Sequence, residues 1–268
     1  MSLSIAGKTA IVTGAAKGIG LAVARHFQAK GANVMFVDID EASLEAELGE
    51  DARSEGSVRM FVGDLREKLT IANLLSATID AFDRVDILVN ASRRMAVSDP
   101  LNAEDDAVDM LWQENVMTSL RLSQMAAKRM IIQAEKTQSD GLIGAIINIS
   151  SIAGCQTQPQ LLGYSMAAAA VDQMTRSLAV ALAPKGIRVN AVAFGSVMSA
   201  SLKSSLKESP DWREAIVAGT PMGRIAAPDE LTEVMQFLAS DASGFMTGQV
   251  LRVDGGRGLL DRVVIPAF

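Results

Sequence analysis

Short apolar runs alternate with longer stretches of helical spacing along almost the whole chain. Most of the predicted strands are continuous apolar segments, as expected for parallel strands that are covered on both faces. They comprise residues Thr9–Thr13, Asn33–Asp38, Val58–Val62, Asp86–Asn90, Gly144–Ile149, Ile187–Ala193 and Gln249–Val253. The predicted helices comprise residues Ile19–Lys30, Leu69–Phe82, Ala107–Ala134, Ser165–Ala183 and Pro228–Ala239. This alternation predicts an α/β fold of the doubly wound, Rossmann-like class, with a seven-stranded parallel sheet flanked by helices.

The chain shows no linker rich in Pro, Gly and Ser, no internal repeat and no low-complexity tract. The polar stretch Glu135–Gly141 precedes a central predicted strand and is expected to form a surface loop. We therefore predict a single domain over residues 1–268.

Composition and charge exclude several classes of protein. With 49% hydrophobic and 21% charged residues, the chain can bury a core and is not intrinsically disordered. Its 25 Lys+Arg against 31 Asp+Glu give a net charge of −6, which argues against a nucleic-acid surface or a polybasic membrane contact. A single cysteine excludes an internal disulfide, and one histidine with one cysteine leaves no material for a His/Cys metal site. Without a secretory signal or an apolar run of about 18 residues, a cytoplasmic protein is expected.

A glycine-rich segment, TGAAKGIG at Thr13–Gly20, follows the first predicted strand and opens the first predicted helix. Glycines there allow a tight turn and a close approach to a pyrophosphate, whose charge lies at the helix N-terminus. The spacing is G-xxx-G-x-G rather than the broader G-x-G-xx-G, and by itself such a loop can be only a turn. Its position between strand and helix favours dinucleotide binding, with these candidate residues: Gly14, Lys17, Gly18, Ile19 and Gly20.

Asp38 ends the second predicted strand, where a carboxylate can accept hydrogen bonds from both adenosine ribose hydroxyls and repel a 2′-phosphate. The alternative is a solvated loop acid or a helix cap ahead of Glu41. Lys17 is the one feature that points toward NADP, although it can equally be a surface charge. NAD is therefore favoured over NADP as the cofactor.

At this point the sequence resembles the short-chain dehydrogenase/reductase family, and the resemblance covers nearly the whole chain. The matching segments follow the family's order and separations: TGAAKGIG (Thr13–Gly20), Asp64, DILVN (Asp86–Asn90), Asn115, NISS (Asn148–Ser151), Tyr164 and VDGG (Val253–Gly256). The resemblance implies that Asp64 and Leu65 flank the adenine. It also places Asn90 and Ala91 under the adenosine half of the cofactor, and Gly195 and Val197 near the nicotinamide half.

The family transfers hydride between a nicotinamide and an alcohol/ketone pair, which implies an NAD-dependent oxidoreductase acting on a small alcohol or ketone. Tyr164 matches the family's proton donor and acceptor, and Ser151 matches the serine that holds the substrate oxygen. Asn115 matches the asparagine that kinks a helix and positions a water for proton relay.

Three departures from the family pattern fall near the nicotinamide half of the cofactor. The Tyr-x-x-x-Lys motif ends in Ala168, so the lysine that lowers the tyrosine pKa and binds the nicotinamide ribose is missing. The usual Asn-Asn-Ala-Gly has Arg93 in place of glycine, and the usual Pro-Gly has Phe194 in place of proline.

Three explanations of Ala168 remain open at this stage. Arg93 or Arg94 reaches the site and replaces the lost cation, although these two residues can also be a solvated loop pair. Alternatively, the chain binds dinucleotide without turnover, as a pseudoenzyme and partner subunit beside an active relative. The third explanation is an introduced substitution that removes activity.

By the same resemblance, residues 196–219 enclose the substrate, and their polar, poorly patterned sequence predicts a mobile lid. The tail 257–268 ends in the apolar run VVIPAF, which is expected to pack against neighbouring subunits. The long helices flanking Tyr164 match the family's usual dimer face. A homotetramer is therefore expected.

Overall fold

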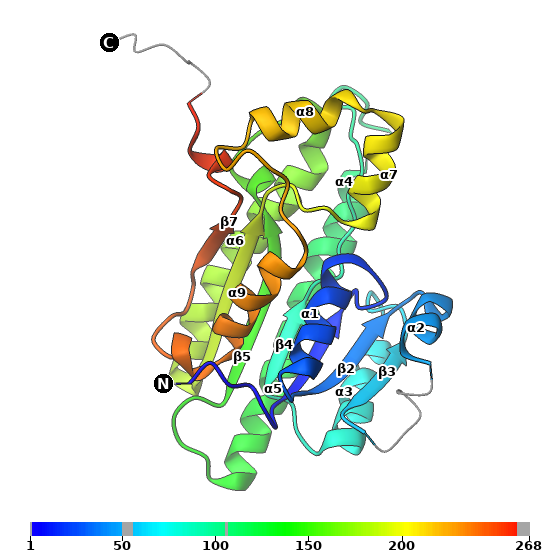
Figure 1. The fold of residues 1–268 in the computed structure, drawn as a ribbon. Coiled ribbons are helices and arrows are strands. Elements are labelled where there is room, and N and C mark those ends of the chain that lie inside the picture. Colours follow the sequence, from blue (N-terminus) through cyan, green and yellow to red (C-terminus); the bar gives the residue numbers. More distant parts are fainter. Residues whose placement is uncertain (1, 50–55, 105–106, 262–268) are drawn as a thin grey trace.

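The computed structural model describes residues 2–49, 56–104 and 107–261, and in these ranges seven strands form one parallel sheet (Figure 1). The strands are β1 Thr9–Thr13, β2 Asn33–Asp38, β3 Val58–Val62, β4 Ile87–Asn90, β5 Gly144–Ser151, β6 Ile187–Phe194 and β7 Val250–Val253. Their order is β3-β2-β1-β4-β5-β6-β7, and every neighbouring pair is parallel. This doubly wound order confirms the predicted fold class.

The strand boundaries follow the apolar runs closely. β1, β2 and β3 have the predicted bounds, whereas β5 and β6 continue beyond them to Ser151 and Phe194. The extra residues of β5 pair with the end of β6, Ser150 with Ala193 and Ser151 with Phe194. Because the sheet ladder satisfies the backbone of the two serines, β5 extends past the end of its hydrophobic pattern.

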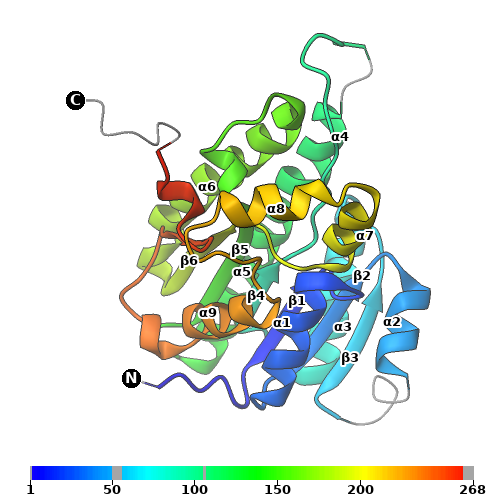
Figure 2. The same cartoon turned by 45° about the horizontal axis from the view of Figure 1, so that its top comes forward.

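Helices cover both faces of the sheet (Figures 1 and 2). One face carries α1 Gly18–Ala29, α2 Glu41–Leu48 and α9 Asp229–Ala239, and the other carries α3 Lys68–Phe82, α5 Thr118–Thr137 and α6 Leu162–Leu182. Each face buries its own core, including Phe27 and Met235 on the first and Leu74, Leu122 and Met130 on the second. In the described residues, no helix combines the length and apolarity needed to cross a membrane.

The predicted helix Ala107–Ala134 is one helical run of three parts. It consists of α4 Val108–Leu111, the π-helical turn η1 Trp112–Met117, and α5. The widened turn contains Asn115, the residue expected to kink this helix. α5 also continues to Thr137, so the loop predicted from Glu135 begins three residues too early, and Gln138 ends the helix in a left-handed conformation.

The region 196–219 contains two helices that the sequence pattern did not predict, α7 Ala200–Glu208 and α8 Asp211–Ala218. Ser199 begins α7 by accepting a hydrogen bond from the Leu202 backbone N–H. The hydrophobic pattern did not reveal these helices, because short polar helices are held by caps and by packing that such a pattern does not register.

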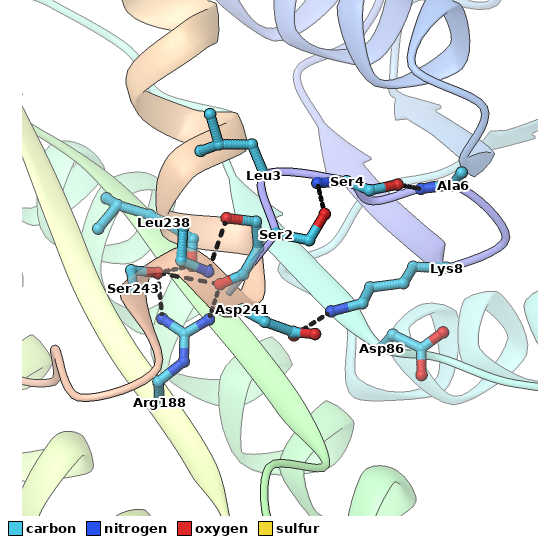
Figure 3. A network of polar contacts seen from close by, with 12 residues as sticks. Ser2, Leu3, Ser4, Ala6, Lys8, Asp86, Arg188, Leu238, Asp241 and Ser243 are labelled. Atoms are coloured by element: carbon cyan, nitrogen blue, oxygen red, sulfur yellow. Dashed lines mark hydrogen bonds and ion pairs between the residues drawn. The ribbon is translucent and has the colours of Figure 1, made fainter.

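A buried arginine ties β6 to the end of α9 and to the N-terminal segment (Figure 3). Arg188 donates to the Ser243 hydroxyl at 2.8 Å and to the Ser240 carbonyl at 3.0 Å. The Ala242 backbone N–H in turn donates to the Ser2 carbonyl at 3.1 Å. Burial lowers the pKa of Arg188, and the nearby Asp241 carboxylate opposes this effect. The network therefore depends on hydrogen bonds that compensate a poorly solvated cation.

Replacing Arg188 by Met is expected to lower the free energy of unfolding by about 1–3 kcal/mol, because it leaves buried acceptors at Ser240 and Ser243 without their donor. Urea denaturation measures the change. The control is Arg176→Met, which removes an exposed arginine on α6. Equal stability of the two variants would contradict the prediction.

Candidate active site

A large cavity of about 1840 Å³ opens along the carboxyl ends of the strands. Its walls come from the loops that follow β1 to β6 and from residues of α7 and α8. These two helices lie beyond the carboxyl ends of the strands (Figure 1). The strand order reverses between β1 and β4, so the cavity spans the crevice where doubly wound sheets bind ligands. The predicted lid residues do border this cavity, including Ser199, Leu202, Trp212 and Ile216.

The glycine loop is packed too closely for side chains at two positions. A Cβ on Gly14, whose φ is +66°, would lie 2.9 Å from the backbone N and Cα of Ser92. A Cβ on Gly20 would lie 2.1 Å from the Gly14 carbonyl oxygen. α1 begins at Gly18 without a side-chain cap and without an acidic residue in its first turn, so its first backbone N–H groups remain available to an anion. Gly14, Lys17, Gly18, Ile19 and Gly20 all line the cavity.

Asp38 lies at the cavity wall beside this loop. Its Oδ2 accepts a hydrogen bond from the Ala16 backbone N–H at 3.0 Å, and its Oδ1 accepts one from Ile39 at 2.8 Å. A carboxylate has about four acceptor sites, so these bonds orient Asp38 without using up its capacity. Lys17 points to a different acid, with its Nζ 3.4 Å from Asp40 Oδ2. The cap of α2 is also Asp40 rather than Asp38.

Asp64 and Leu65 border the same end of the cavity. Arg66 binds the Asp64 carboxylate through two nitrogens, at 2.9 and 2.6 Å. This pair holds the pKa of Asp64 below its usual range. Leu65 is almost buried and presents a small apolar surface there.

The last residue of β4, Asn90, and the residue after it, Ala91, have different surroundings. The Asn90 amide is buried and donates to Ser123 Oγ at 2.9 Å and to Asn148 Oδ1 at 2.8 Å. Asn90 is not among the residues that line the cavity, whereas Ala91 is. The Ala91 backbone N–H donates to Thr13 Oγ1, which joins the loop after β4 to the glycine loop. Asn90 thus holds the sheet together beneath the cavity.

Ser151 and Tyr164 meet at the cavity from the end of β5 and the first turn of α6, each 7% exposed. Ser151 Oγ accepts a hydrogen bond from the Ala153 backbone N–H at 3.2 Å, which leaves its proton to be donated elsewhere. Gly195 and Val197, in the loop after β6, line the cavity as well. Ser151 and Tyr164 therefore line the same cavity as Gly195 and Val197, the two residues expected near the nicotinamide half of the cofactor.

Asn115 lies behind this wall. Its Oδ1 accepts from the Arg94 backbone N–H at 2.8 Å, and its Nδ2 donates to the Arg94 carbonyl at 2.9 Å. It also borders a small cavity of about 10 Å³ together with Arg93 and Ala168, which is close to the space that one water needs. The side chain of Asn115 therefore positions the segment that carries the two arginines.

Arg93 turns inward, whereas Arg94 turns outward. The Arg93 guanidinium carbon lies 4.7 Å from the ring centroid of Tyr164 and 5.6 Å from that of Phe194, and Nη1 donates to the Ser150 carbonyl at 2.6 Å. Arg94 is exposed and pairs with Glu114 at 3.4 Å. The interpretation as a solvated pair thus holds for Arg94 and is wrong for Arg93.

Asp172, one helical turn beyond Ala168 on α6, is a half-buried acid that was not among the site residues predicted from the sequence. Burial raises the pKa of Asp172, and a hydrogen bond from Ser150 with the charges of Arg176 and Arg93 opposes the rise only in part. Its Oδ1 is buried without a hydrogen-bond partner among the described residues. Its spacing of four residues from Ala168, which puts both residues on one face of the helix, could have identified Asp172 from the sequence.

Asp172→Asn is expected to increase the free energy of unfolding at pH 7, because it removes a carboxylate that burial disfavours. The advantage should decline as the pH falls toward 3.8, the ordinary pKa, because the folded protein protonates Asp172 first and relieves the penalty. Urea denaturation at several pH values measures it, with the exposed Glu135→Gln as control. A variant that is less stable at pH 7 would contradict the expectation.

Within the described part of the chain, no cluster of three or more His, Cys, Asp or Glu side chains is placed to hold a metal ion. The tail predicted to pack against neighbouring subunits begins at Arg257, and among its described residues Arg257, Leu260 and Asp261 line the cavity. The apolar run VVIPAF lies outside the described residues.

Comparison with known proteins agrees with this geometry. A family model described as enoyl-(acyl carrier protein) reductase matches residues 14–257. A 3-oxoacyl-[acyl-carrier-protein] reductase of Thermotoga maritima is 32% identical, over 95% of this chain and 99% of that protein. The cis-4-hydroxycyclohexanecarboxylate dehydrogenase of Sinomonas cyclohexanicum is 35% identical, over 96% and 98%.

A solved structure of 7α-hydroxysteroid dehydrogenase, complexed with NADH and 7-oxoglycochenodeoxycholic acid, superposes with a TM-score of 0.85. It is 29% identical and covers 95% of this chain and 95% of that chain. These relatives are oxidoreductases that bind nicotinamide dinucleotides as a family. The chain belongs to the short-chain dehydrogenase/reductase family.

Proposed function

We propose that the chain is an NAD-dependent oxidoreductase that interconverts a small alcohol and its ketone. The observation that carries this proposal is the shared wall of Ser151, Tyr164 and Gly195 beside a glycine loop built for a dinucleotide. The names of two relatives, a hydroxycyclohexanecarboxylate dehydrogenase and a hydroxysteroid dehydrogenase, support an alcohol/ketone pair.

The residues fit a nicotinamide dinucleotide. The uncapped N-terminus of α1 would hold the pyrophosphate, and Asp38 would hold the adenosine ribose. Asp64, Leu65 and Ala91 would border the adenosine half, with Asn90 supporting them from the sheet. Gly195 and Val197 would lie against the nicotinamide half. The nicotinamide supplies or accepts the hydride when it is bound.

We favour NAD over NADP because of the charges around Asp38. A 2′-phosphate would meet the carboxylate of Asp38, and the one lysine of the glycine loop is already paired with Asp40. Arg66 is likewise engaged by Asp64. Both cations would have to leave a carboxylate to neutralise an added phosphate.

The chemistry at the substrate oxygen would be shared by two hydroxyl groups. Ser151 donates a hydrogen bond to the oxygen, and Tyr164 gives or takes the proton as the reaction direction requires. Asn115 acts through the Arg94 backbone, so it is a positioning residue.

The three departures from the family pattern form one cluster. Arg93 stacks on Tyr164 and Phe194 and borders the same small cavity as Ala168. Its positive charge therefore lies close to the position that the lysine occupies in the family. We propose that Arg93 provides the positive charge that assists Tyr164. This favours an active enzyme over a dinucleotide-binding pseudoenzyme.

Binding and turnover can be tested together. NAD and NADH binding is measured by calorimetry, and an alcohol/ketone panel is assayed, for this protein and for Ala168→Lys. Ala169→Lys, which adds the same charge on the exposed side of α6, is the control. Binding with turnover by the unaltered protein supports the proposal. Turnover only by Ala168→Lys would identify a pseudoenzyme, and an absence of binding would overturn the cofactor assignment.

We also propose a homotetramer in the cytoplasm, built on the outer surfaces of α5 and α6 as in the family. Met166 and Val180 are exposed apolar residues on α6. Light scattering that gives the mass of four chains would support it. A monomer, or co-purification with an active relative, would contradict a homotetramer.

A further inference from the structure

An arginine without an acidic partner lies on the cavity wall. Arg257, in the short 3-10 turn η6 Arg257–Leu259 after β7, is half-buried and lines the cavity. Its Nη1 donates to Ser196 Oγ at 2.8 Å, and its carbonyl accepts a hydrogen bond from Gln156 Nε2 at 3.3 Å. These two contacts fix both the backbone and the direction of the guanidinium.

The remaining donors of Arg257 are accessible. Its Nε and Nη2 have no partner among the described residues, and neither is buried away from solvent. No ion pair of Arg257 with a carboxylate is found in the described part of the chain. One edge of the guanidinium is thus free to receive an anion with two oxygens, the geometry that a carboxylate fits.

Arg257 belongs to the substrate end of the cavity. Ser196 follows β6, and Gln156 follows the segment that begins at Ser151. Four strand spacings of about 4.8 Å separate β6 from β2, where Asp38 lies, and three separate it from the glycine loop after β1. The charge is therefore roughly 14–19 Å from the regions proposed for the pyrophosphate and the adenosine ribose.

The cavity that Arg257 lines also has apolar side chains on its wall. Ile152, Leu161, Trp212, Ile216 and Leu260 line the same cavity. Two acids of the cavity wall are not paired with Arg257 in the described residues. Glu114 is paired with Arg94, and Asp261 is solvent-exposed. Arg93 also lines the cavity, but its guanidinium is stacked on Tyr164 and Phe194, whereas Arg257 keeps one edge open. An oriented cation beside apolar side chains can select one charged group on a hydrophobic ligand.

We propose that Arg257 is a substrate-binding residue that receives a carboxylate, so that the preferred substrate is a hydroxy acid or keto acid with an apolar body. The identification of the substrate as a hydroxy acid or keto acid rests on the proposed alcohol/ketone chemistry. The carboxylate subsite itself is a binding property that does not require turnover.

Binding is tested first with non-reacting probes on the protein saturated with NADH. Cyclohexanecarboxylate and its neutral amide, cyclohexanecarboxamide, are titrated by calorimetry. The carboxylate is expected to bind about 10- to 100-fold more tightly, and Arg257→Gln should remove this preference while leaving the affinity for NADH unchanged. Arg257→Lys should keep part of it. Arg213→Gln, an exposed arginine of α8, is the matched control.

Turnover is then compared for levulinate and its methyl ester. A larger kcat/KM for levulinate that is lost in Arg257→Gln, with the value for the ester unchanged, supports the subsite. Equal binding of the two probes, or no binding of either, overturns it. Selective carboxylate binding without turnover of any ketone would leave the subsite standing and reject the proposed oxidoreductase function, so the two failures are distinguishable.

Discussion

Tyr164→Phe is expected to lower kcat by about 100- to 10,000-fold in both reaction directions, because the phenol is the proposed proton donor and acceptor at the substrate oxygen. Phenylalanine keeps the ring against which Arg93 stacks, so NADH affinity and the melting temperature should stay close to those of the unaltered protein. Steady-state kinetics with the best substrate of the panel measures the loss.

The matched control for this substitution is Ser165→Ala, which removes the neighbouring hydroxyl. Ser165 Oγ is buried without a hydrogen-bond partner among the described residues, so kcat should remain unchanged. Turnover that survives in Tyr164→Phe would mean that another group transfers the proton, and the roles proposed for Tyr164 and Arg93 would both be wrong.

Arg93→Ala is expected to lower kcat by roughly 30-fold, equivalent to about 2 kcal/mol, because a cation beside Tyr164 would stabilise the negative charge that develops on its oxygen during proton transfer. The KM for NADH should change much less, because the dinucleotide contacts assigned to Asp38 and the glycine loop remain. Arg93→Lys keeps the charge and should recover part of the rate. Arg94→Ala, which removes the exposed neighbour paired with Glu114, should have little effect.

A double substitution separates electrostatic assistance from space filling. Arg93→Gly with Ala168→Lys restores the family's residues at both positions and should turn over faster than Arg93→Ala. If Arg93→Ala instead matches or exceeds the unaltered protein, Arg93 obstructs the site rather than assisting Tyr164. The role proposed for Arg93 would then be wrong.

Local patterns were sufficient for much of the sheet. β1, β2 and β3 were predicted residue for residue because buried parallel strands are continuous apolar runs bounded by polar residues. The helices α7 and α8 were missed because they are short and mostly exposed, and their position depends on the cavity they cover. The same limit applies to α2, in which Leu44 and Leu48 are the buried residues of a helix of eight.

The sequence by itself determined the family, the doubly wound sheet and the loss of the lysine, because these depend on residue types in a fixed order. Only the tertiary structure decided which of the two neighbouring arginines lies beside Tyr164. Arg93 and Arg94 are adjacent in sequence, yet the clamp of Asn115 on the Arg94 backbone and the rings of Tyr164 and Phe194 send one side chain inward and the other to Glu114. Arg257 is likewise placed at the cavity by hydrogen bonds with Ser196 and Gln156, which lie about 60 and 100 positions away in the sequence. No local sequence pattern records such contacts. Such directions are set by packing between distant segments, and therefore emerge only when the chain is folded.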